Sequence, residues 1–474
     1  MTDIQEATAA GLLNKLALSS APNLKSTRKY ISAANSSSEI ISAQQVYGKY
    51  SQSLQSTAWG SSSTITVPSS SMVSNCYLYY QMTVPAPPGV SYSPLWETGV
   101  GYSMLAQVAY TLGSANTSQL ALQGREAIIM CVMNSCGTAE GATEYWYQAG
   151  NNSAAIAAGN NRSTTNSYVI EGTLLLPLPW SSTCPEGRVP FDLSLLQSGQ
   201  PVLLRIDLVQ NPGSFMGGFN AATWNPPVLT TATILFTHNE LSDSTFSLGS
   251  QLRLASLKGN NQMIVSYPFI HYQAFTAGQQ ITAPTNGTSY GGLNSQVQSI
   301  PLNSFIRSDL LGISFALINT VDDIGGVTAA LPGGGTAIGR FNPQTIPNFE
   351  LLYNGQRLMY CPGTTSCQTL MNMKGSQGST YFEGSNQSGT VSASYNVSPA
   401  YLYPITYWSS QLGRKSVCDP FWLDNTVRYS NQTLTLNFTC PLTTVPATYR
   451  LVCLYSYQAL IEVGAQGQTS IIFN

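Results

Sequence analysis

Charged residues are scarce in this 474-residue sequence. Asp, Glu, Lys and Arg together make up 8% of it, against about 25% in an average soluble domain. The formal net charge is −2, and the densest basic stretch, Lys25–Lys29, holds three cations, which would neutralise only about three phosphates. We therefore expect no direct, sequence-specific binding of nucleic acid.

Long apolar runs are also missing. No stretch reaches the roughly 18–20 residues that a membrane-spanning helix needs. Residues 1–20 contain no cationic leader before an apolar stretch, so the sequence predicts no secretory signal. Both features favour a protein of a reducing compartment, where disulfides are rare.

Ligands for a metal ion or a disulfide framework are few. The chain has two histidines and nine cysteines, an odd number, and it contains no C-x-x-C pair. The cysteines fall in predicted strands (Cys76, Cys131, Cys440 and Cys453) and in predicted loops (Cys361 and Cys367). We expect buried, reduced thiols, no metal site and no cofactor.

Nucleophiles and bases lack a catalytic setting in this sequence. His238 and His271 lie in predicted strands between apolar residues, where packing is the commoner role. Ser289 lies in a G-x-S-x-G match, but polar loop sequence surrounds it, whereas a nucleophile elbow joins a strand to a helix. The glycine-rich segment 331–340 lacks the Lys-Ser/Thr of a P-loop. We predict no catalytic residue and no enzyme activity.

The sequence does contain two β-rich series. Its length exceeds what one core usually serves, so two domains are expected. Runs of β-branched and aromatic residues bounded by Gly, Pro, Asn and Ser indicate strands. The first series comprises 62–67, 76–85, 102–112, 168–177, 201–209 and 228–240. The second comprises 262–275, 296–301, 309–319, 349–360, 390–396, 400–408, 433–440, 449–463 and 469–473.

Three other segments do not have a clear strand pattern. Residues 1–52 are predicted to form an arm, either with an amphipathic helix from Ile4 to Leu18 or as a frayed tail. Residues 124–136 fit a short helix or a buried strand. Residues 189–200 fit one or two helical turns.

A hairpin is indicated at Asn354-Gly355. The pair lies between apolar-rich flanks in ELLYNGQRLMY. A two-residue type I′ turn needs positive φ at both central residues, which Asn and Gly tolerate best. The sequence therefore predicts two strands joined by a tight turn here.

The two series repeat one pattern. Three anchors follow in the same order: Pro68 over Pro301 at an offset of 233, residues 202–208 over 434–440, and Leu235 over Leu454 at an offset of 219. Variation in loop length accounts for the change of offset. The repeat predicts two copies of one antiparallel β-domain, spanning 53–245 and 246–474.

Several stretches together resemble a known family in their pattern and order. They are 63–84, 99–133, 189–209 and 232–242 in the first half, and 300–318, 349–360 and 433–463 in the second. The family comprises the double-jelly-roll major capsid proteins of icosahedral double-stranded DNA viruses, such as polinton-like viruses, virophages and nucleocytoplasmic large DNA viruses, in the adenovirus-hexon-like lineage. The very low charge of this chain departs from the family.

The resemblance implies an all-β fold of two tandem antiparallel eight-stranded jelly rolls with long loops and a few short helices. It implies a homotrimer, a pseudo-hexagonal capsomer that tiles an icosahedral shell. The implied partners are neighbouring capsomers, minor capsid or penton proteins, and an internal membrane reached by the inward-facing arm 1–52. The implied location is the virion, after synthesis and assembly inside the host cell.

A second interpretation stays open, a cell-surface adhesin or glycan-binding tandem β-sandwich protein. Its binding platform would be built from aromatic residues, although packing in cores and interfaces is their commoner use. The candidates are Tyr77, Tyr79, Tyr80, Trp408, Phe421 and Trp422. The expected lack of a secretory signal counts against this interpretation.

Overall fold

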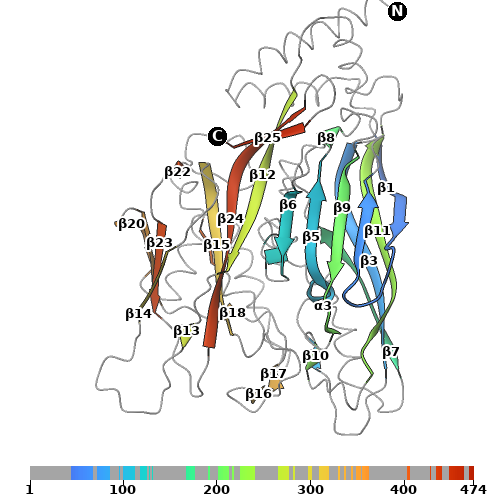
Figure 1. Ribbon diagram of the computed structural model, residues 1–474, viewed down its shortest axis with the longest axis horizontal. Coiled ribbons are helices and arrows are strands. Elements are labelled where there is room, and N and C mark those ends of the chain that lie inside the picture. The colour runs from blue at the N-terminus through green and yellow to red at the C-terminus, as the bar shows by residue number, and fades with distance from the viewer. Residues whose placement is uncertain are drawn as a thin grey trace, which may run out of the picture.

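The structure is a computed structural model built mainly of antiparallel strands (Figure 1). The residues that it describes are 44–67, 72–85, 95–96, 100–112, 118–124, 127–128, 131, 167–176, 191–192, 201–212, 216–217, 225–240, 265–276, 281–282, 297–301, 309–319, 329–330, 336–337, 343–344, 348–353, 355–361, 403–405, 427–428, 434–439, 448–463 and 469–473.

The first half of the chain forms two antiparallel sheets. One has the order β1-β11-β3-β7, made of Gln44–Ser53, Val228–Glu240, Met72–Val84 and Tyr168–Leu176, with β8 (Phe191–Asp192) also paired to β3. The other has the order β2-β9-β5-β6, made of Ser62–Thr66, Leu203–Leu208, Leu105–Thr111 and Ser118–Gln123. The chain crosses between the two sheets at most steps, while β5 and β6 form a hairpin within one sheet, which is the topology of a jelly roll.

The second half repeats this arrangement. One sheet is built on β12-β24-β15, made of Val265–Thr276, Thr448–Val463 and Asp309–Asn319. Short strands join it: β18 (Pro343–Gln344), β21 (Tyr403–Ile405) and β22 (Val427–Arg428) pair with β15, and β13 (Ile281–Thr282) and β25 (Thr469–Phe473) pair with β24. The other sheet has the order β14-β23-β19-β20, made of Val297–Pro301, Leu434–Thr439, Phe349–Tyr353 and Gln356–Cys361.

The strand orders of the two halves correspond. β12, β24 and β15 take the places of β1, β11 and β3, and the short strands β18, β21 and β22, all paired with β15, share the place of β7. β14, β23, β19 and β20 take the places of β2, β9, β5 and β6. The predicted all-β fold of two tandem jelly rolls and the predicted repeat are confirmed. The boundary between the predicted domains 53–245 and 246–474 remains a prediction.

The repeat holds for strands but not for every residue. Leu78 of β3 pairs with Ile234 of β11, and the sequence offsets place these residues on Leu311 and Cys453. Cys453 instead pairs with Phe315, four residues further along β15. Because side chains alternate between the two faces of a strand, an even shift keeps every inward residue inward. The two halves have therefore slipped in register without turning a strand over.

Alternating burial forms the two cores. In β2 the pattern is exposed, buried, exposed, buried, exposed, as expected when one face meets the core. Cys76 on β3 reaches across to a hydrogen bond with Tyr110 on β5, which links the two sheets of the first jelly roll. In the second, the rings of Phe315 and Phe349 meet edge to face, with centroids 5.1 Å apart. Each fully buried apolar side chain contributes about 1.5–3 kcal/mol.

The four sheets follow one another across the molecule (Figure 1). The β12-β24-β15 sheet lies between the β14-β23-β19-β20 sheet and the first jelly roll, and the edge strand β6 of the first jelly roll contacts the edge strand β12 of the second. Among the strands that the structure describes, β6 and β12 join the two jelly rolls, and they hold different places in the common topology.

The predicted hairpin is confirmed. β19 ends at Tyr353, β20 begins at Gln356, and these two residues pair. Gly355 has φ +76° with no atom within 4 Å of an added Cβ, so the backbone alone explains why glycine is needed there. Asn354 lies outside the described residues, so the type I′ assignment stays a prediction.

Several local predictions were wrong. Residues 44–52, placed in the arm, belong to β1, which pairs with β11 and so is part of the first jelly roll. Residues 191–192, placed in a helix, form β8 because Phe191 and Asp192 pair with β3. Cys361 ends β20 rather than lying in a loop. The strand expected at 102 begins at Leu105, after the short helix α3 (Val100–Ser103).

Other predictions are settled or lie outside the described residues. Ala127, Ile128 and Cys131 are helical and buried, which favours the helix in 124–136. β6 was not predicted, because SQLALQ has few β-branched residues. The segment Ile4–Leu18 and the strand expected at 390–396 lie outside the described residues. Additional short pairs are β4 (Leu95–Trp96) with β10 (Met216–Gly217), and β16 (Ala329–Ala330) with β17 (Thr336–Ala337).

Candidate assembly surfaces

The residues weighed for catalysis are not brought together in the described part of the chain. His238 lies in β11, opposite Val46 and Val73. His271 lies in β12 of the other jelly roll, with its ring centroid 6.5 Å from that of Tyr457. Ser289 and most of 331–340 lie outside the described residues. Among the described residues, no three His, Cys, Asp or Glu side chains are grouped to hold a metal ion, and no helix has the length and apolar character to cross a membrane.

The described thiols are buried. Cys76, Cys131 and Cys453 are buried and form no disulfide, which confirms the predicted burial of these three thiols. Burial raises the pKa of Cys76 to about 12, opposed by its hydrogen bond with Tyr110, and it also raises the pKa values of Cys131 and Cys453. A thiol held protonated in an apolar setting is a poor nucleophile.

The aromatic residues proposed as a sugar platform are separated. Tyr80 is fully buried in the first core, whereas Tyr77 and Tyr79, on the same strand, point outward and are half-buried. Trp408, Phe421 and Trp422 lie outside the described residues. The three candidate tyrosines of β3 thus divide between the core and one outward sheet face, and we therefore turn to the outward faces as candidate functional surfaces.

One outward face is covered. On β24, Cys453 pairs with Phe315, which faces the core, so Val452 and Leu454 must point outward. They are nevertheless 2% and 0% exposed, and Tyr272, on the same side of β12, is 6% exposed. The first jelly roll lies on this side, with β6 against β12. We call Tyr272, Val452 and Leu454 the covered face.

The equivalent face of the first jelly roll is open. Its outward positions on β11, namely Thr231, Thr233 and Leu235, are half-exposed. Ser51 and Ser53 on β1, which pair with Leu235 and Thr233, are exposed. We call the outward residues of β1, β11, β3 and β7 the open face.

The far rim of the open face carries two exposed valines. Val228 and Val169 flank Thr83 in one row across β11, β3 and β7, and they are 55% and 57% exposed. In the next row the Gln81 amide donates to Glu171 at 3.0 Å, and the Tyr79 hydroxyl donates to the same carboxylate at 3.3 Å. Among the described side chains this face offers mixed apolar and neutral polar contacts, with one carboxylate.

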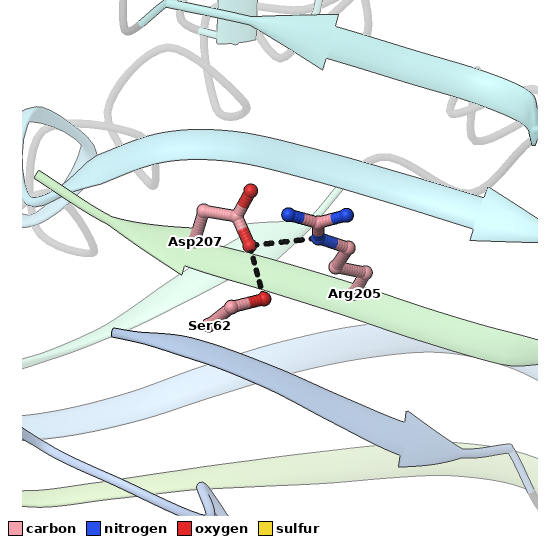
Figure 2. Close-up of polar contacts among 3 residues, drawn as sticks. All are labelled: Ser62, Arg205 and Asp207. Atoms are coloured by element: carbon pink, nitrogen blue, oxygen red, sulfur yellow. Dashed lines mark hydrogen bonds and ion pairs between the residues drawn. The ribbon is translucent and has the colours of Figure 1, made fainter. Parts of the chain in front are cut away.

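The outward face of β2-β9-β5-β6 carries a small polar cluster (Figure 2). Ser62 donates to Asp207 Oδ1 at 2.6 Å, and Arg205 Nε donates to the same oxygen at 2.9 Å. Partial burial alone would raise the pKa of Asp207, but the hydrogen bonds from Arg205 and Ser62 bring it below its ordinary value. The carboxylate is therefore ionised and already neutralised by its own strand.

The outward face of β14-β23-β19-β20 carries a counterpart. Arg357 on β20 contacts Glu350 Oε2 through Nε and Nη2, each at 2.9 Å. Asn437 donates to Oε1 at 2.8 Å, and the Arg357 guanidinium lies 4.7 Å from the ring centroid of Tyr360. The Asn437 hydrogen bond lowers the pKa of Glu350, partial burial opposes this, and Arg357 lowers it further. We call Glu350, Arg357, Tyr360 and Asn437 the β20 cluster.

Neither cluster was found from the sequence, although signals for both exist. Arg205 and Asp207 are two residues apart on a predicted strand, which places them on one face. Glu350 and Arg357 flank the predicted Asn354-Gly355 turn, which brings their strands together. Alternation within a strand and pairing across a hairpin would have identified both ion pairs.

Comparison with known proteins identifies structures with the same fold but no protein related in sequence. No family model and no curated protein matches the chain. One similar structure is a chain of the quasi-atomic model of the PBCV-1 virus capsid. The match covers 91% of this chain and 96% of that chain, with a TM-score of 0.58 and 12% sequence identity. PBCV-1 VP54 fitted into a reconstruction of the virophage Sputnik covers the same shares, with a TM-score of 0.53 and 11% identity.

A third match is the Sputnik virophage solved by cryo-EM, which covers 91% of this chain and 88% of its own, with a TM-score of 0.51 and 12% identity. These matches run through both jelly rolls, because they cover nine-tenths of the chain. The chain therefore has the double-jelly-roll fold found in the capsid structures of PBCV-1 and Sputnik.

Proposed function

We propose that this protein is a major capsid protein, whose homotrimers form pseudo-hexagonal capsomers that tile an icosahedral shell. The observation that carries the proposal is the difference between the covered face and the open face. Equivalent strands of the two jelly rolls bury Val452 and Leu454 but leave Thr233 and Leu235 half-exposed. The shared fold with capsid structures supports it.

Repetition of the in-chain contact between copies would cover the open face. Within a chain, β6 at the edge of one jelly roll contacts β12 at the edge of the sheet that carries the covered face. In the common topology the matching places are held by β20, at the edge of β14-β23-β19-β20, and by β1, at the edge of the open face. Joining these two between copies is a head-to-tail contact, which generates a ring when the rotation closes. Three chains would supply six jelly rolls in such a ring.

The low charge of the chain suits this role. A shell brings many copies of one surface together, and a net charge of −2 per chain avoids large repulsion between neighbours. The Arg205–Asp207 and Arg357–Glu350 pairs are each neutral in sum. Such surfaces can be brought together without leaving an unpaired charge.

The remaining partners follow from this proposal. Trimers would contact neighbouring capsomers and minor capsid or penton proteins. The segment before the first jelly roll would face inward, toward such proteins or an internal membrane. Synthesis and assembly would take place in a host cell and the mature protein would reside in the virion, with no direct sequence-specific binding of nucleic acid and no catalysis.

Sedimentation velocity tests the proposal. The expected species has about 150 kDa, three times the 50.8 kDa of one chain, and a hexagonal outline in negative-stain images. A monomer at micromolar concentration would contradict it. A monomer that also binds a defined sugar on a glycan array would favour the adhesin interpretation instead.

A further inference from the structure

We propose that the edge strand β20 of one copy packs against β1 and β11 of the next copy, with Tyr360 and Arg357 as its anchors. This inference rests on the proposed trimer and names the strands and side chains that would join its chains. The partner is a second copy of this chain, and the surface that receives β20 is the part of the open face formed by Ser51, Ser53, Thr233 and Leu235.

The in-chain contact supplies the template. β6 lies against β12 within one chain. β20 holds in the second jelly roll the place that β6 holds in the first, and β1 holds the place of β12. If the same contact recurs between copies, β20 must meet β1. The direction follows as well, because β6 and β12 are already used within the chain.

The exposed side chains of β20 are of the kind that anchors interfaces. Tyr360 is 49% exposed, although it is a large aromatic residue. The Arg357 side chain is 60% exposed and lies 4.7 Å from the centre of the Tyr360 ring. Tyr and Arg are enriched among the residues that dominate binding energy. Because each side chain restrains the other, less conformational freedom is lost on binding.

The charge of Arg357 does not prevent burial. Glu350 accepts two contacts at 2.9 Å from the guanidinium, and Asn437 satisfies its second oxygen at 2.8 Å. The β20 cluster is therefore neutral in sum and largely hydrogen-bonded before any partner arrives. A pair that is already matched costs less to desolvate than an isolated charge.

The receiving surface is complementary in character. Ser51 and Ser53 present short exposed hydroxyl side chains on β1, and the Ser53 and Thr233 hydroxyl oxygens lie 3.4 Å apart. Leu235, next to Ser51 across the strands, adds half-exposed apolar area. Short side chains beside one apolar residue leave space for an aromatic ring, and none of these four carries a charge that would oppose Arg357.

Site-directed cross-linking tests the strand pairing. Tyr360→Cys is combined with Ser51→Cys or with Ser53→Cys, and the full-length protein is treated with a short bismaleimide. The matched control combines Tyr360→Cys with Val169→Cys, which lies in β7 at the opposite edge of the same sheet. Single-cysteine variants measure the background from native thiols. We expect covalent dimers and trimers of chains with Ser51 or Ser53 and only background with Val169.

The same samples are examined by sedimentation velocity, which separates this inference from the proposed function. An intact trimer without cross-links to Ser51 or Ser53, or with equal linkage to Val169, would overturn the pairing while the trimer stands. A monomer would overturn the proposed function itself. In a second experiment, Tyr360→Ala should weaken trimer formation by about tenfold, while Tyr360→Phe retains most of it. An unchanged dissociation constant for Tyr360→Ala would contradict the anchoring role.

Discussion

Leu454 and Leu235 point outward from equivalent strands of the two jelly rolls, yet Leu454 is fully buried and Leu235 is half-exposed. Both strands are second in their sheets: β11 lies between β1 and β3, and β24 lies between β12 and β15. The first jelly roll lies on the outward side of the β12-β24-β15 sheet, where β6 contacts β12, whereas the outward side of the β1-β11-β3-β7 sheet faces away from the second jelly roll. The burial of outward apolar side chains on a repeated domain therefore indicates which of its faces contacts a neighbouring domain.

A matched pair of substitutions gives the strongest test of whether the two outward faces differ in packing. Leu454→Ala should lower the free energy of unfolding by about 2–5 kcal/mol, because a buried leucine leaves a cavity. Leu235→Ala should lower it by less than about 1 kcal/mol in the isolated chain and should instead weaken self-association. Urea unfolding and sedimentation velocity measure the two effects, and equal losses of unfolding free energy would show that both faces are packed alike.

A smaller loss of stability is expected from a substitution in helix α3, which packs in the first jelly roll. A Cβ added at Gly101 would lie 2.5 Å from Leu174 Cδ2 and 2.9 Å from Tyr80 Cε1, so Gly101→Ala overfills the first core. We expect a loss of about 1–3 kcal/mol in unfolding free energy, measured by thermal or urea unfolding. The loss for Gly101→Ala combined with Leu174→Ala should be smaller than the sum of the two single losses, because the added methyl group enters space that Leu174 vacates. Full stability of the single variant would contradict the close packing.

The hairpin of the second jelly roll should be sensitive to backbone conformation alone. Gly355 has positive φ and open space around its Cβ position, so Gly355→Ala should cost about 1 kcal/mol without any clash. Gly355→Asn should cost less, because asparagine tolerates this conformation. Equal stability of the alanine variant and the parent protein in urea unfolding would show that the turn has relaxed.

The two outward ion pairs should have the smallest effects and a defined pH dependence. Hydrogen bonds hold the folded-state pKa values of Asp207 and Glu350 below the ordinary 3.8 and 4.5. Their stabilisation is therefore complete above these ordinary values and is lost as pH falls through the lower folded-state values. Because Arg205 and Arg357 are well exposed, each pair should contribute less than about 1 kcal/mol.

Asp207→Asn and Glu350→Gln measure these contributions separately in the two jelly rolls. Each variant should be less stable than the parent near neutral pH, and the difference in urea unfolding should shrink as pH falls below the ordinary pKa values of the two carboxyl groups. A difference that persists at low pH would mean that packing, rather than charge, is responsible. A difference well above 1 kcal/mol for one pair would distinguish the two faces energetically.

The strands could be predicted from the sequence because their apolar residues alternate and their ends carry turn residues. β9, β11, β15 and β24 were all located within two residues of their bounds. β6 and β1 were missed because QLAL and QQVYGKYSQS contain few β-branched residues, so tertiary pairing decides their structure. β8 was read as a helix for a similar reason: the pairing of Phe191 with Val73 is not visible in the local pattern.

The outward surfaces were harder to predict than the strands. Composition indicated a weakly charged surface, and the described side chains of the open face have that character. Which faces are covered depends on how two jelly rolls of one chain meet, and no local signal encodes this. The exposure of Tyr360 likewise depends on the order of strands in its sheet, because an inner strand at that place would bury it.

The pairing of β15 with β24 is shifted by four residues relative to that of β3 with β11, and this shift bears on how duplicated β-domains diverge. An odd slip of a whole strand would turn apolar side chains to water and hydroxyls to the interior, unless a β-bulge absorbs the extra residue. The pairings of β3 with β11 and of β15 with β24 both contain such irregularities. Searches for ancient tandem repeats in β-proteins would gain sensitivity by allowing even slips within strands and single-residue slips only at bulges.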